Sequence, residues 1–352
     1  MTTGWFAGRV GPDDDATAPL RVGVLGAGRI GRLHCELLAR DVAGATVTVV
    51  ADTRRDAARR LAARIGARAT TDAAEVVASP DVDAVAVCTS TESHADAIVA
   101  IAEAGKAVFC EKPVSLRLSE VDRALAAVER AGVPFMAGFN RRFDPGHASV
   151  RQAVEDGTVG SVHLVRITSR DPEPPPREYL ASSGGIFLDM TIHDFDMARF
   201  VVGAEIVEVT AFGAVRVDPV IGAAGDVDTA VTVLTHADGT ITTIDNSRRA
   251  VYGYDQRVEV FGDRGVARSE NPVQHAGWSC TAERTTGPVL PWFFLDRYLA
   301  SYRAEWERFV AYLQSGGASP VDAASARAPI VAALAAGRSL RERRPVCVSE
   351  VG

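Results

Sequence analysis

The chain has 352 residues, of which 47% are hydrophobic and 24% charged, and its formal net charge is −7. This composition is that of an ordinary soluble protein with enough length for two domains. The acidic balance and the lack of a dense run of Lys and Arg exclude nucleic acid or an anionic membrane surface as the main partner. We therefore expect a small-molecule ligand.

Residues 1–20 mix Gly, Pro and a DDD run without an apolar core segment, which excludes a signal peptide and indicates a mobile tail. No uninterrupted apolar run approaches membrane-spanning length. The cysteines show neither CxxC spacing nor an even disulfide framework, so we expect a reducing, cytoplasmic location and no role as metal ligand or nucleophile. They are Cys35, Cys88, Cys110, Cys280 and Cys347.

Short apolar runs alternate with Ala- and Arg-rich helical stretches between residues 21 and 140. The runs are RVGVLGAG, ATVTVVAD, AVAVCTS, AVFCEKP and PFMAGF. Alternating strands and helices predict an α/β domain with a doubly wound parallel sheet that is covered on both faces.

The pattern changes in residues 141–352. Period-two alternation there is broken by the turn signals HADG and GDRG, which indicates antiparallel strands with one face solvated or covered by a partner. Residues 294–316 and 324–343 have the pattern of amphipathic helices. We predict a second domain of α+β type with a mainly antiparallel sheet.

The stretch VGVLGAGRIGRLH places Gly26, Gly28 and Gly31 in GxGxxG spacing between an apolar strand and a helix. In that context the glycines permit a tight turn, the close approach of a pyrophosphate and close helix packing. The motif predicts a dinucleotide site in a Rossmann domain, with Arg29 and Ile30 beside the cofactor.

Asp52 ends the next strand, TVTVVAD, where a carboxylate can accept hydrogen bonds from the adenosine ribose and repel a 2′-phosphate. This favours NAD, with Thr53 also beside the ribose. Arg54 and Arg55 follow at once, and they can instead grip that phosphate, which would select NADP, or form a solvated first turn of a helix.

Two further strand ends should meet at the cofactor crevice. In CTSTESHADAIV, Thr89 and Ser90 follow a strand, and His94 either covers the nicotinamide side of the cleft or flanks a helix cap. In FCEKPVS, Glu111 and Lys112 end another strand. A lysine there can hold a substrate hydroxyl and stabilise negative charge on its oxygen, although an EKP turn is also common in solvated loops.

Residues 187–200, FLDMTIHDFDMARF, combine apolar and acidic side chains. In a helix Asp189 and His193, four residues apart, share a face, so the carboxylate can hold the imidazole. Such a pair is either a structural contact or a general base with its orienting group. Asp196 and Arg199, three residues apart, predict a salt bridge within the helix.

The motifs GxGxxG, EKP and DMTIHD together resemble the family of glucose-fructose oxidoreductase and inositol dehydrogenase, and within it the bacterial inositol 2-dehydrogenases. Further matching segments are GFNRRFDPGH, ITSRDPEPPP, NSRRAVYGYDQRVEVFG and YLASYRAEWERF. The likeness runs from about residue 21 to the C-terminus. It implies an NAD-binding Rossmann domain and a second domain whose large open sheet commonly forms the interface of a homo-oligomer, often a homotetramer.

The resemblance implies a catalytic set of Lys112, Asp189 and His193. His193 would take the proton from a ring hydroxyl as hydride leaves the same carbon for the nicotinamide. Asp189 would orient that base, and Lys112 would polarise the oxygen, which makes a metal unnecessary. The same motifs place four more residues around the substrate, namely Arg141, Asp171, Asp194 and Tyr254.

The implied reaction is NAD-dependent oxidation of a cyclitol secondary alcohol, myo-inositol to scyllo-inosose, as in inositol catabolism. Substrate choice depends on a few loop residues, so a dehydrogenase of another polyol or sugar, such as scyllo-inositol or an aldose, is the alternative. A non-catalytic NAD-sensing regulator on this fold should lack the EKP lysine or the helix histidine, and both are present.

Overall fold

The computed structural model describes residues 18–180 and 182–352. The chain forms two compact units. The first comprises the residues up to Asn140 together with Tyr302–Arg327, and the second comprises Arg141–Ser301 and Ala328–Gly352. Residues 1–17 of the predicted tail lie outside the described residues, and Leu20, which was expected in the tail, begins the first strand.

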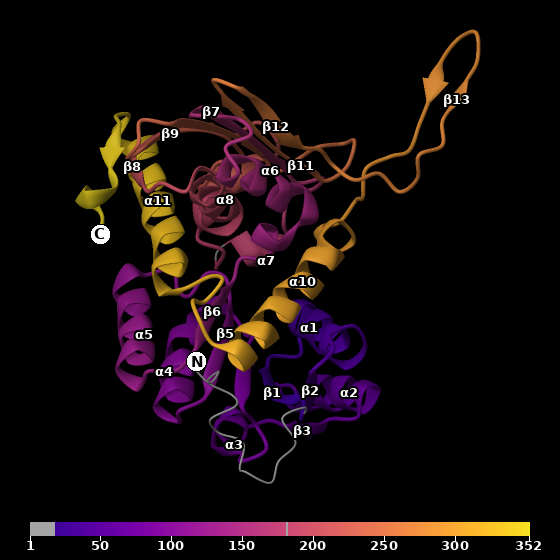
Figure 1. Ribbon diagram of the computed structural model, residues 1–352, viewed down its shortest axis with the longest axis vertical. Coiled ribbons are helices and arrows are strands. Elements are labelled where there is room, and N and C mark those ends of the chain that lie inside the picture. The colour runs from indigo at the N-terminus through magenta and orange to yellow at the C-terminus, as the bar shows by residue number, and fades with distance from the viewer. Residues whose placement is uncertain (1–17, 181) are drawn as a thin grey trace. The chain divides into compact units, whose positions relative to one another are not determined.

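A six-stranded parallel sheet with the order β3-β2-β1-β4-β5-β6 forms the centre of the first unit. Its strands are β1 Leu20–Leu25, β2 Ala45–Ala51, β3 Arg68–Thr70, β4 Ala84–Val87, β5 Ala107–Glu111 and β6 Phe135–Gly138. Its helices are α1 Arg29–Arg40, α2 Arg55–Ile65, α3 Ala73–Ala78, α4 His94–Glu103 and α5 Leu118–Ala131. Helices α1 and α2 lie on one side of the sheet and α4 and α5 on the other (Figure 1). The predicted Rossmann fold is confirmed.

The burial of this sheet explains its sequence. Every residue of β4 and β5 is buried, because helices cover both faces, and such strands are continuously apolar rather than alternating. The strand order reverses between β1 and β4. In open parallel sheets the crevice at such a reversal, beyond the carboxyl ends of the strands, is where ligands bind.

The segment Tyr302–Arg327 was expected in the second domain, and the structure assigns it to the first unit. It contains the later part of α10, which spans Phe294–Ser315. Trp306 is fully buried and stacks on Phe109 of β5 with 4.4 Å between ring centroids. The sequence shows that the helix is amphipathic, but it does not show which sheet the apolar face covers.

A seven-stranded sheet with the order β12-β11-β7-β10-β9-β8-β15 forms the second unit. Its strands are β7 Val162–Arg170, β8 Ile206–Ala214, β9 Thr229–His236, β10 Ile241–Ser247, β11 Asp255–Gly262, β12 Gly265–Ser269 and β15 Val346–Cys347. Within the described chain β7 and β10 pair in parallel and the other neighbours pair antiparallel. This confirms the predicted α+β domain with a mainly antiparallel sheet.

The remaining elements of the second unit are helices and one hairpin. The helices are α6 Pro145–Glu155, α7 Arg177–Leu180, α8 Ile192–Val202, α9 Pro219–Ala223 and α11 Ala323–Glu342, whose first residues belong to the first unit. Helices α6 and α8 pack against one face of the sheet. The hairpin of β13 Ser279–Cys280 and β14 Thr285–Thr286 extends away from the sheet (Figure 1).

The other face of this sheet, here called the open face, carries large exposed apolar side chains. They are Leu164, Phe212, Val231, Ile241, Phe261 and Val266. The strand register places them in two groups. Phe212 lies opposite Val231 in one group, and in the other Leu164 lies opposite Ile241 and Phe261, which also lies opposite Val266. The prediction of one solvated or partner-covered face fits this arrangement.

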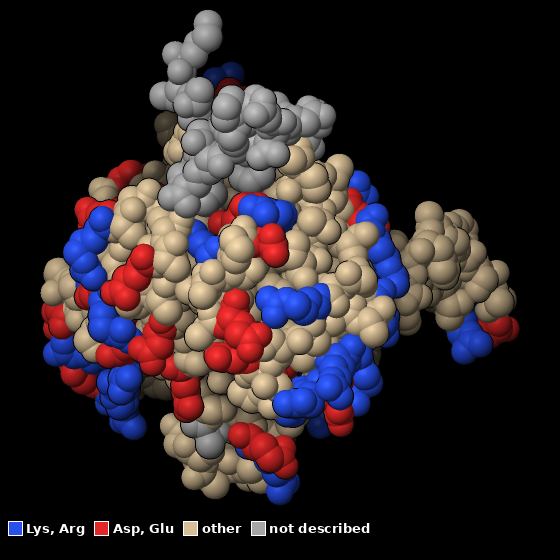
Figure 2. Space-filling model, turned by 90° about the horizontal axis from the view of Figure 1, so that it is seen from below, with Lys and Arg blue, Asp and Glu red and all other residues tan. Residues whose placement is uncertain are grey.

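Basic and acidic side chains are interspersed over the surface shown in Figure 2. Among the described residues, no helix has the length and apolar character needed to cross a membrane.

Candidate active site

The glycine loop connects β1 to α1 in the first unit. Gly26 has φ +101°, and a Cβ there would lie 2.4 Å from the carbonyl oxygen of Cys88. A Cβ on Gly31 would lie 1.9 Å from the oxygen of Gly26, so both positions require glycine for packing. Gly28, the N-cap of α1, differs because its Cβ would meet nothing within 4 Å. The open space at the start of a helix fits a pyrophosphate.

Asp52 stands beside this loop at the end of β2. Its Oδ2 accepts a hydrogen bond from the Ala27 N–H at 2.8 Å, and its Oδ1 accepts one from the Arg54 N–H at 2.8 Å. Burial opposes ionisation of Asp52, but these hydrogen bonds outweigh it and lower the pKa. The carboxylate is therefore anionic. The Arg54 guanidinium is largely exposed, with Nε 3.4 Å from Asp52 Oδ1.

His94, a predicted cofactor contact, is 2% exposed at the start of α4. Its Nδ1 lies 2.9 Å from the Pro113 oxygen and its Nε2 lies 3.1 Å from the Thr89 oxygen. Burial lowers the pKa of His94, so the ring is neutral and donates to one of these carbonyls. The ring thus joins the turn after β4, which carries Thr89 and Ser90, to the turn that carries Lys112.

Glu111 ends β5 and is buried. The indole N–H of Trp306 donates to Nδ1 of His34 at 2.8 Å, so the imidazole proton sits on Nε2. That N–H donates to Glu111 Oε1 at 2.7 Å, and the backbone N–H of Lys112 is 3.3 Å from Glu111 Oε2. The carboxylate of EKP is therefore held inside the first unit, and it fixes the backbone of the lysine that follows.

In the second unit the predicted helix around Asp189 and His193 is present, but its first turn, Phe187–Thr191, is π-helical and α8 begins only at Ile192. Single π-helical turns occur often at functional sites. Asp189 Oδ1 accepts a hydrogen bond from the Tyr179 hydroxyl at 2.9 Å, and Oδ2 accepts one from Arg248 Nη1 at 3.2 Å.

Sequence reasoning missed both partners of Asp189. Tyr179 lies only 10 positions away, but in a separate short helix, and Arg248 lies 59 positions away. The signal available for Arg248 was the NSRRA segment, which spans the end of β10.

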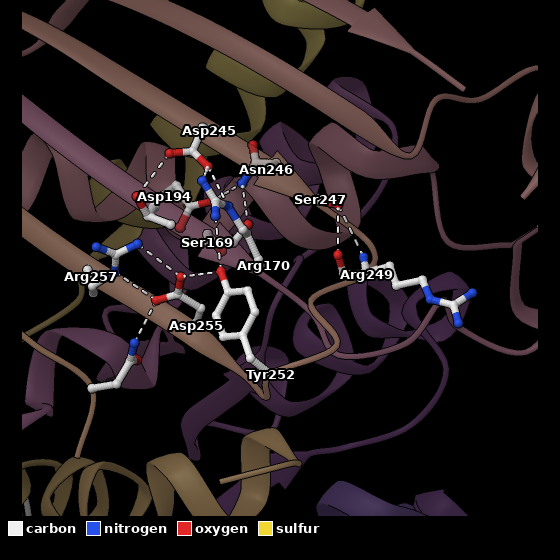
Figure 3. Close-up of polar contacts among 12 residues, drawn as sticks. Ser169, Arg170, Asp194, Asp245, Asn246, Ser247, Arg249, Tyr252, Asp255 and Arg257 are labelled. Atoms are coloured by element: carbon white, nitrogen blue, oxygen red, sulfur yellow. Dashed lines mark hydrogen bonds and ion pairs between the residues drawn. The ribbon is translucent and has the colours of Figure 1, made fainter. Parts of the chain in front are cut away.

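Three predicted substrate residues form one buried network. Arg141 Nη1 donates to Asp194 Oδ1 at 2.7 Å, and Arg141 Nη2 lies 3.3 Å from the Tyr254 hydroxyl. The Asn246 amide donates to Asp194 Oδ2 at 2.8 Å, and Figure 3 shows Asp194, Asn246 and Ser169 together beside the sheet. Burial raises the pKa of Asp194, while Arg141 and Asn246 oppose that shift and hold the anion.

Asp171, the fourth predicted substrate residue, directly follows β7. Burial raises its pKa to about 6, with Arg248 and Arg141 opposing the shift and Asp189 and Asp194 adding to it. Its carboxyl group is therefore harder to ionise than that of an ordinary aspartate.

The predicted helix salt bridge between Asp196 and Arg199 is wrong. Asp196 is 1% exposed and accepts a hydrogen bond from Arg142 Nε at 2.9 Å, whereas Arg199 pairs with Glu205. Residues three apart can meet on a helix surface, but Asp196 faces inward, where a partner from another segment reaches it.

The first unit is a Rossmann fold with a glycine loop and an anionic carboxylate after β2, and the second is an α+β fold with an acid–histidine turn. These features define an NAD-dependent oxidoreductase. Residues 20–139 match the oxidoreductase family with an NAD-binding Rossmann fold, and residues 147–268 match the GFO/IDH/MocA C-terminal domain. The chain belongs to the GFO/IDH/MocA family, and its cofactor is NAD.

Named relatives resemble the chain over nearly its whole length. The myo-inositol 2-dehydrogenase of Thermotoga maritima is 46% identical over 333 residues, which cover 94% of this chain and 99% of that protein. The inositol 2-dehydrogenase of Rhizobium meliloti is 45% identical over 331 residues, with 94% and 99% covered.

Solved structures of similar proteins have the same fold as this chain. The crystal structure of a probable dehydrogenase from Thermotoga maritima has a TM-score of 0.93 at 46% identity and covers 95% of this chain and 100% of that chain. The scyllo-inositol dehydrogenase from Lactobacillus casei with bound NAD(H) and scyllo-inositol has a TM-score of 0.86 at 27% identity, with 94% and 99% covered.

Proposed function

We propose that the protein is an inositol 2-dehydrogenase that oxidises myo-inositol to scyllo-inosose with NAD, as a step of inositol catabolism. The observation that carries the proposal is identity of 45–46% over 94% of this chain to two proteins with that activity in their names. We assign the catalytic roles to Lys112, Asp189 and His193, the residues of its EKP and DMTIH motifs.

The proposed mechanism divides proton and hydride transfer. NAD, held at the glycine loop, would supply the acceptor for the hydride that leaves the carbon bearing the reacting hydroxyl. His193 takes the proton of that hydroxyl at a ring nitrogen, and Asp189 orients the ring and stabilises the imidazolium. Lys112 donates a hydrogen bond to the substrate oxygen and stabilises the charge that develops on it. The hydrogen bonds that hold Asp189 support its role as a fixed group.

The proposed substrate contacts suit a cyclitol, which presents hydroxyl groups on all sides. Asp171, Arg141, Asp194 and Tyr254 supply donors and acceptors rather than an apolar wall. The fixed network of Arg141 and Asp194 supports a rigid polar surface, because each partner already holds the other.

The second candidate is a dehydrogenase of another inositol. A scyllo-inositol 2-dehydrogenase from Bacillus subtilis is 34% identical over 328 residues, and it uses NAD according to its name. Purified protein with NAD should be assayed against myo-inositol, scyllo-inositol, D-glucose and D-xylose by absorbance of the reduced cofactor. A dominant rate with myo-inositol supports the proposal, and a dominant rate with another substrate replaces it.

Asp52 is proposed to select NAD through the ribose hydroxyls. In Asp52→Ser we expect the ratio of kcat/KM for NAD over NADP to fall by about tenfold or more, because repulsion of a 2′-phosphate is lost. The matched control is Asp56→Asn, which removes an equal charge from an exposed position in the first turn of α2. An equal fall in the control, or an unchanged ratio in Asp52→Ser, would refute the role of Asp52.

We further propose a homo-oligomer, with a tetramer favoured, that associates through the open face of the second sheet. That face combines the exposed apolar residues with charged side chains already paired with each other, among them Arg170 with Asp245 and Arg257 with Asp255 (Figure 3). Charges that are already paired with each other lower the free energy needed to bury such a surface in an interface.

The oligomer is tested by Phe212→Glu, because Phe212 is 64% exposed on the open face and lies opposite the exposed Val231. We expect a smaller species in light scattering coupled to size-exclusion chromatography. The control is Leu299→Glu, since Leu299 is 50% exposed on α10 and lies outside the sheet. A Phe212→Glu protein of unchanged mass would contradict an interface on the open face.

We place the enzyme in the cytoplasm. All five cysteines are free thiols, and two of them, Cys280 and Cys347, are exposed, which supports a reducing compartment.

A further inference from the structure

Arg248 directly follows β10 and is only 1% exposed although it carries a full charge. Its backbone N–H donates to the Asp228 oxygen at 2.9 Å, which ties it to the start of β9. A buried charge is costly unless other groups compensate it. The groups around the guanidinium must therefore explain why a charged side chain is buried here.

Two carboxylates form ion pairs with the guanidinium. Asp189 Oδ2 lies 3.2 Å from Nη1, and Asp226 Oδ2 lies 3.9 Å from Nη2. The positive charge of Arg248 also favours the ionised form of a third carboxyl group, that of Asp171, against the effect of burial. The buried Arg248 cation thus lies within an acidic cluster that includes Asp189.

The hydrogen bonding of the Arg248 guanidinium is incomplete. Within the described residues, Nε and Nη2 of Arg248 and Oδ2 of Asp226 are buried without a hydrogen bond. A salt bridge that serves stability is typically bidentate and has its donors satisfied. Buried polar groups without partners are costly and call for another explanation, of which a catalytic role is one.

We propose that Arg248 is a positioning residue for the oxidation: its buried guanidinium holds the Asp189 carboxylate and balances its charge, so that His193 is a neutral base at neutral pH. The proposal rests on the proposed function, in which Asp189 orients His193. Arg248 acts through Asp189 and takes no part in proton or hydride transfer itself.

Charged and titratable groups from five segments surround Asp189 and Arg248. These groups are Asp171 after β7, Tyr179 in α7, His193 in α8, Asp226 before β9 and Arg248 after β10. With Arg248 present, the negative charge of Asp189 is balanced. Without Arg248, Asp189 would stabilise protonated His193 more strongly and raise the pKa of the base. A protonated imidazole cannot accept the substrate proton.

The first test compares Arg248→Met, Arg248→Lys and the matched control Arg249→Met, which removes an exposed arginine one position further on. In the profile of kcat/KM against pH, we expect the acid limb of Arg248→Met to move up by about one pH unit. Arg248→Lys keeps the positive charge, so its acid limb should stay close to the wild-type position, and the control should show no shift. A lower kcat/KM with an unmoved limb would reduce Arg248 to a structural role and overturn the proposal.

Asp226→Asn is a second test, in which the acid limb of the pH profile should shift in the opposite direction. The amide oxygen can still accept the hydrogen bond that Asp226 Oδ1 receives from the Ile186 N–H at 3.1 Å. Arg248 then loses one of its counter-charges, so the acid limb should move to lower pH. An unmoved limb, or one that moves up, contradicts the proposal even if Arg248→Met fails to fold.

A second readout does not depend on the substrate. The titration of His193 can be followed by NMR in protein labelled with 13C-histidine, with His193→Gln to assign the signal. We expect the pKa of His193 to rise by about one unit in Arg248→Met and to fall in Asp226→Asn. Failure of every alcohol in the assay would refute the proposed function alone, whereas an unchanged His193 titration in both variants would refute the role of Arg248 alone.

Discussion

His193→Ala is expected to lower kcat by roughly a thousandfold, which is within the range of about 10²–10⁴ for loss of a general base. The alcohol proton must leave as hydride transfer proceeds, and water in the place of the ring is neither oriented nor basic enough. The wild-type rate should rise with pH as His193 becomes neutral, and the variant should lose that limb. Steady-state rates with NAD and myo-inositol from pH 6 to 10 measure both effects.

The matched control for this change is His163→Ala, because His163 is exposed on β7 and far in sequence from the acid–histidine turn. It should retain normal rates. Lys112→Ala should lose a comparable factor through loss of charge stabilisation on the substrate oxygen. Near-normal turnover in either His193→Ala or Lys112→Ala would mean that the catalytic set is assigned wrongly.

Gly28→Val should weaken NAD binding by roughly 100-fold or more, about 2.7 kcal/mol, while the protein stays folded. A Cβ on Gly28 meets no protein atom within 4 Å and its φ is −71°, so the fold can accept a side chain there. The same side chain would occupy the space in which the pyrophosphate approaches the start of α1. Calorimetric titration with NAD and a thermal melt measure the two effects separately.

The comparison for Gly28→Val is Gly287→Val, since a Cβ on Gly287 also meets nothing within 4 Å. It should bind NAD normally. If Gly28→Val bound NAD as tightly as the unchanged protein, the glycine loop would not be the phosphate site. If it lost stability as well as binding, steric damage would replace the proposed explanation.

The fold could be predicted in outline because its signals are local. Continuous apolar strands between helices indicate a parallel sheet, and alternation after residue 140 indicates an antiparallel one. Long-range packing could not be predicted in the same way. The stacking of Trp306 on Phe109 moves Tyr302–Arg327 into the first unit, and amphipathic pattern alone does not specify that partner.

The parts of the candidate site that lie in one short sequence motif could be predicted. Gly26, Gly28 and Asp52 follow from a strand, a turn and the next strand end. The partners of Asp189 and Asp196 were not predictable, because Arg248 and Arg142 reach them from segments more than 50 positions away. Electrostatic partners are set by the tertiary fold, which single-sequence spacing does not encode.

The most direct test of the account uses myo-inositol that carries deuterium on C2 together with unlabelled NAD. We expect a slower rate than with unlabelled substrate, one deuterium in the reduced cofactor by mass spectrometry, and scyllo-inosose as product. Reduced cofactor without deuterium, or an oxidised product with its deuterium still on C2, would contradict hydride transfer from that carbon and with it the proposed function.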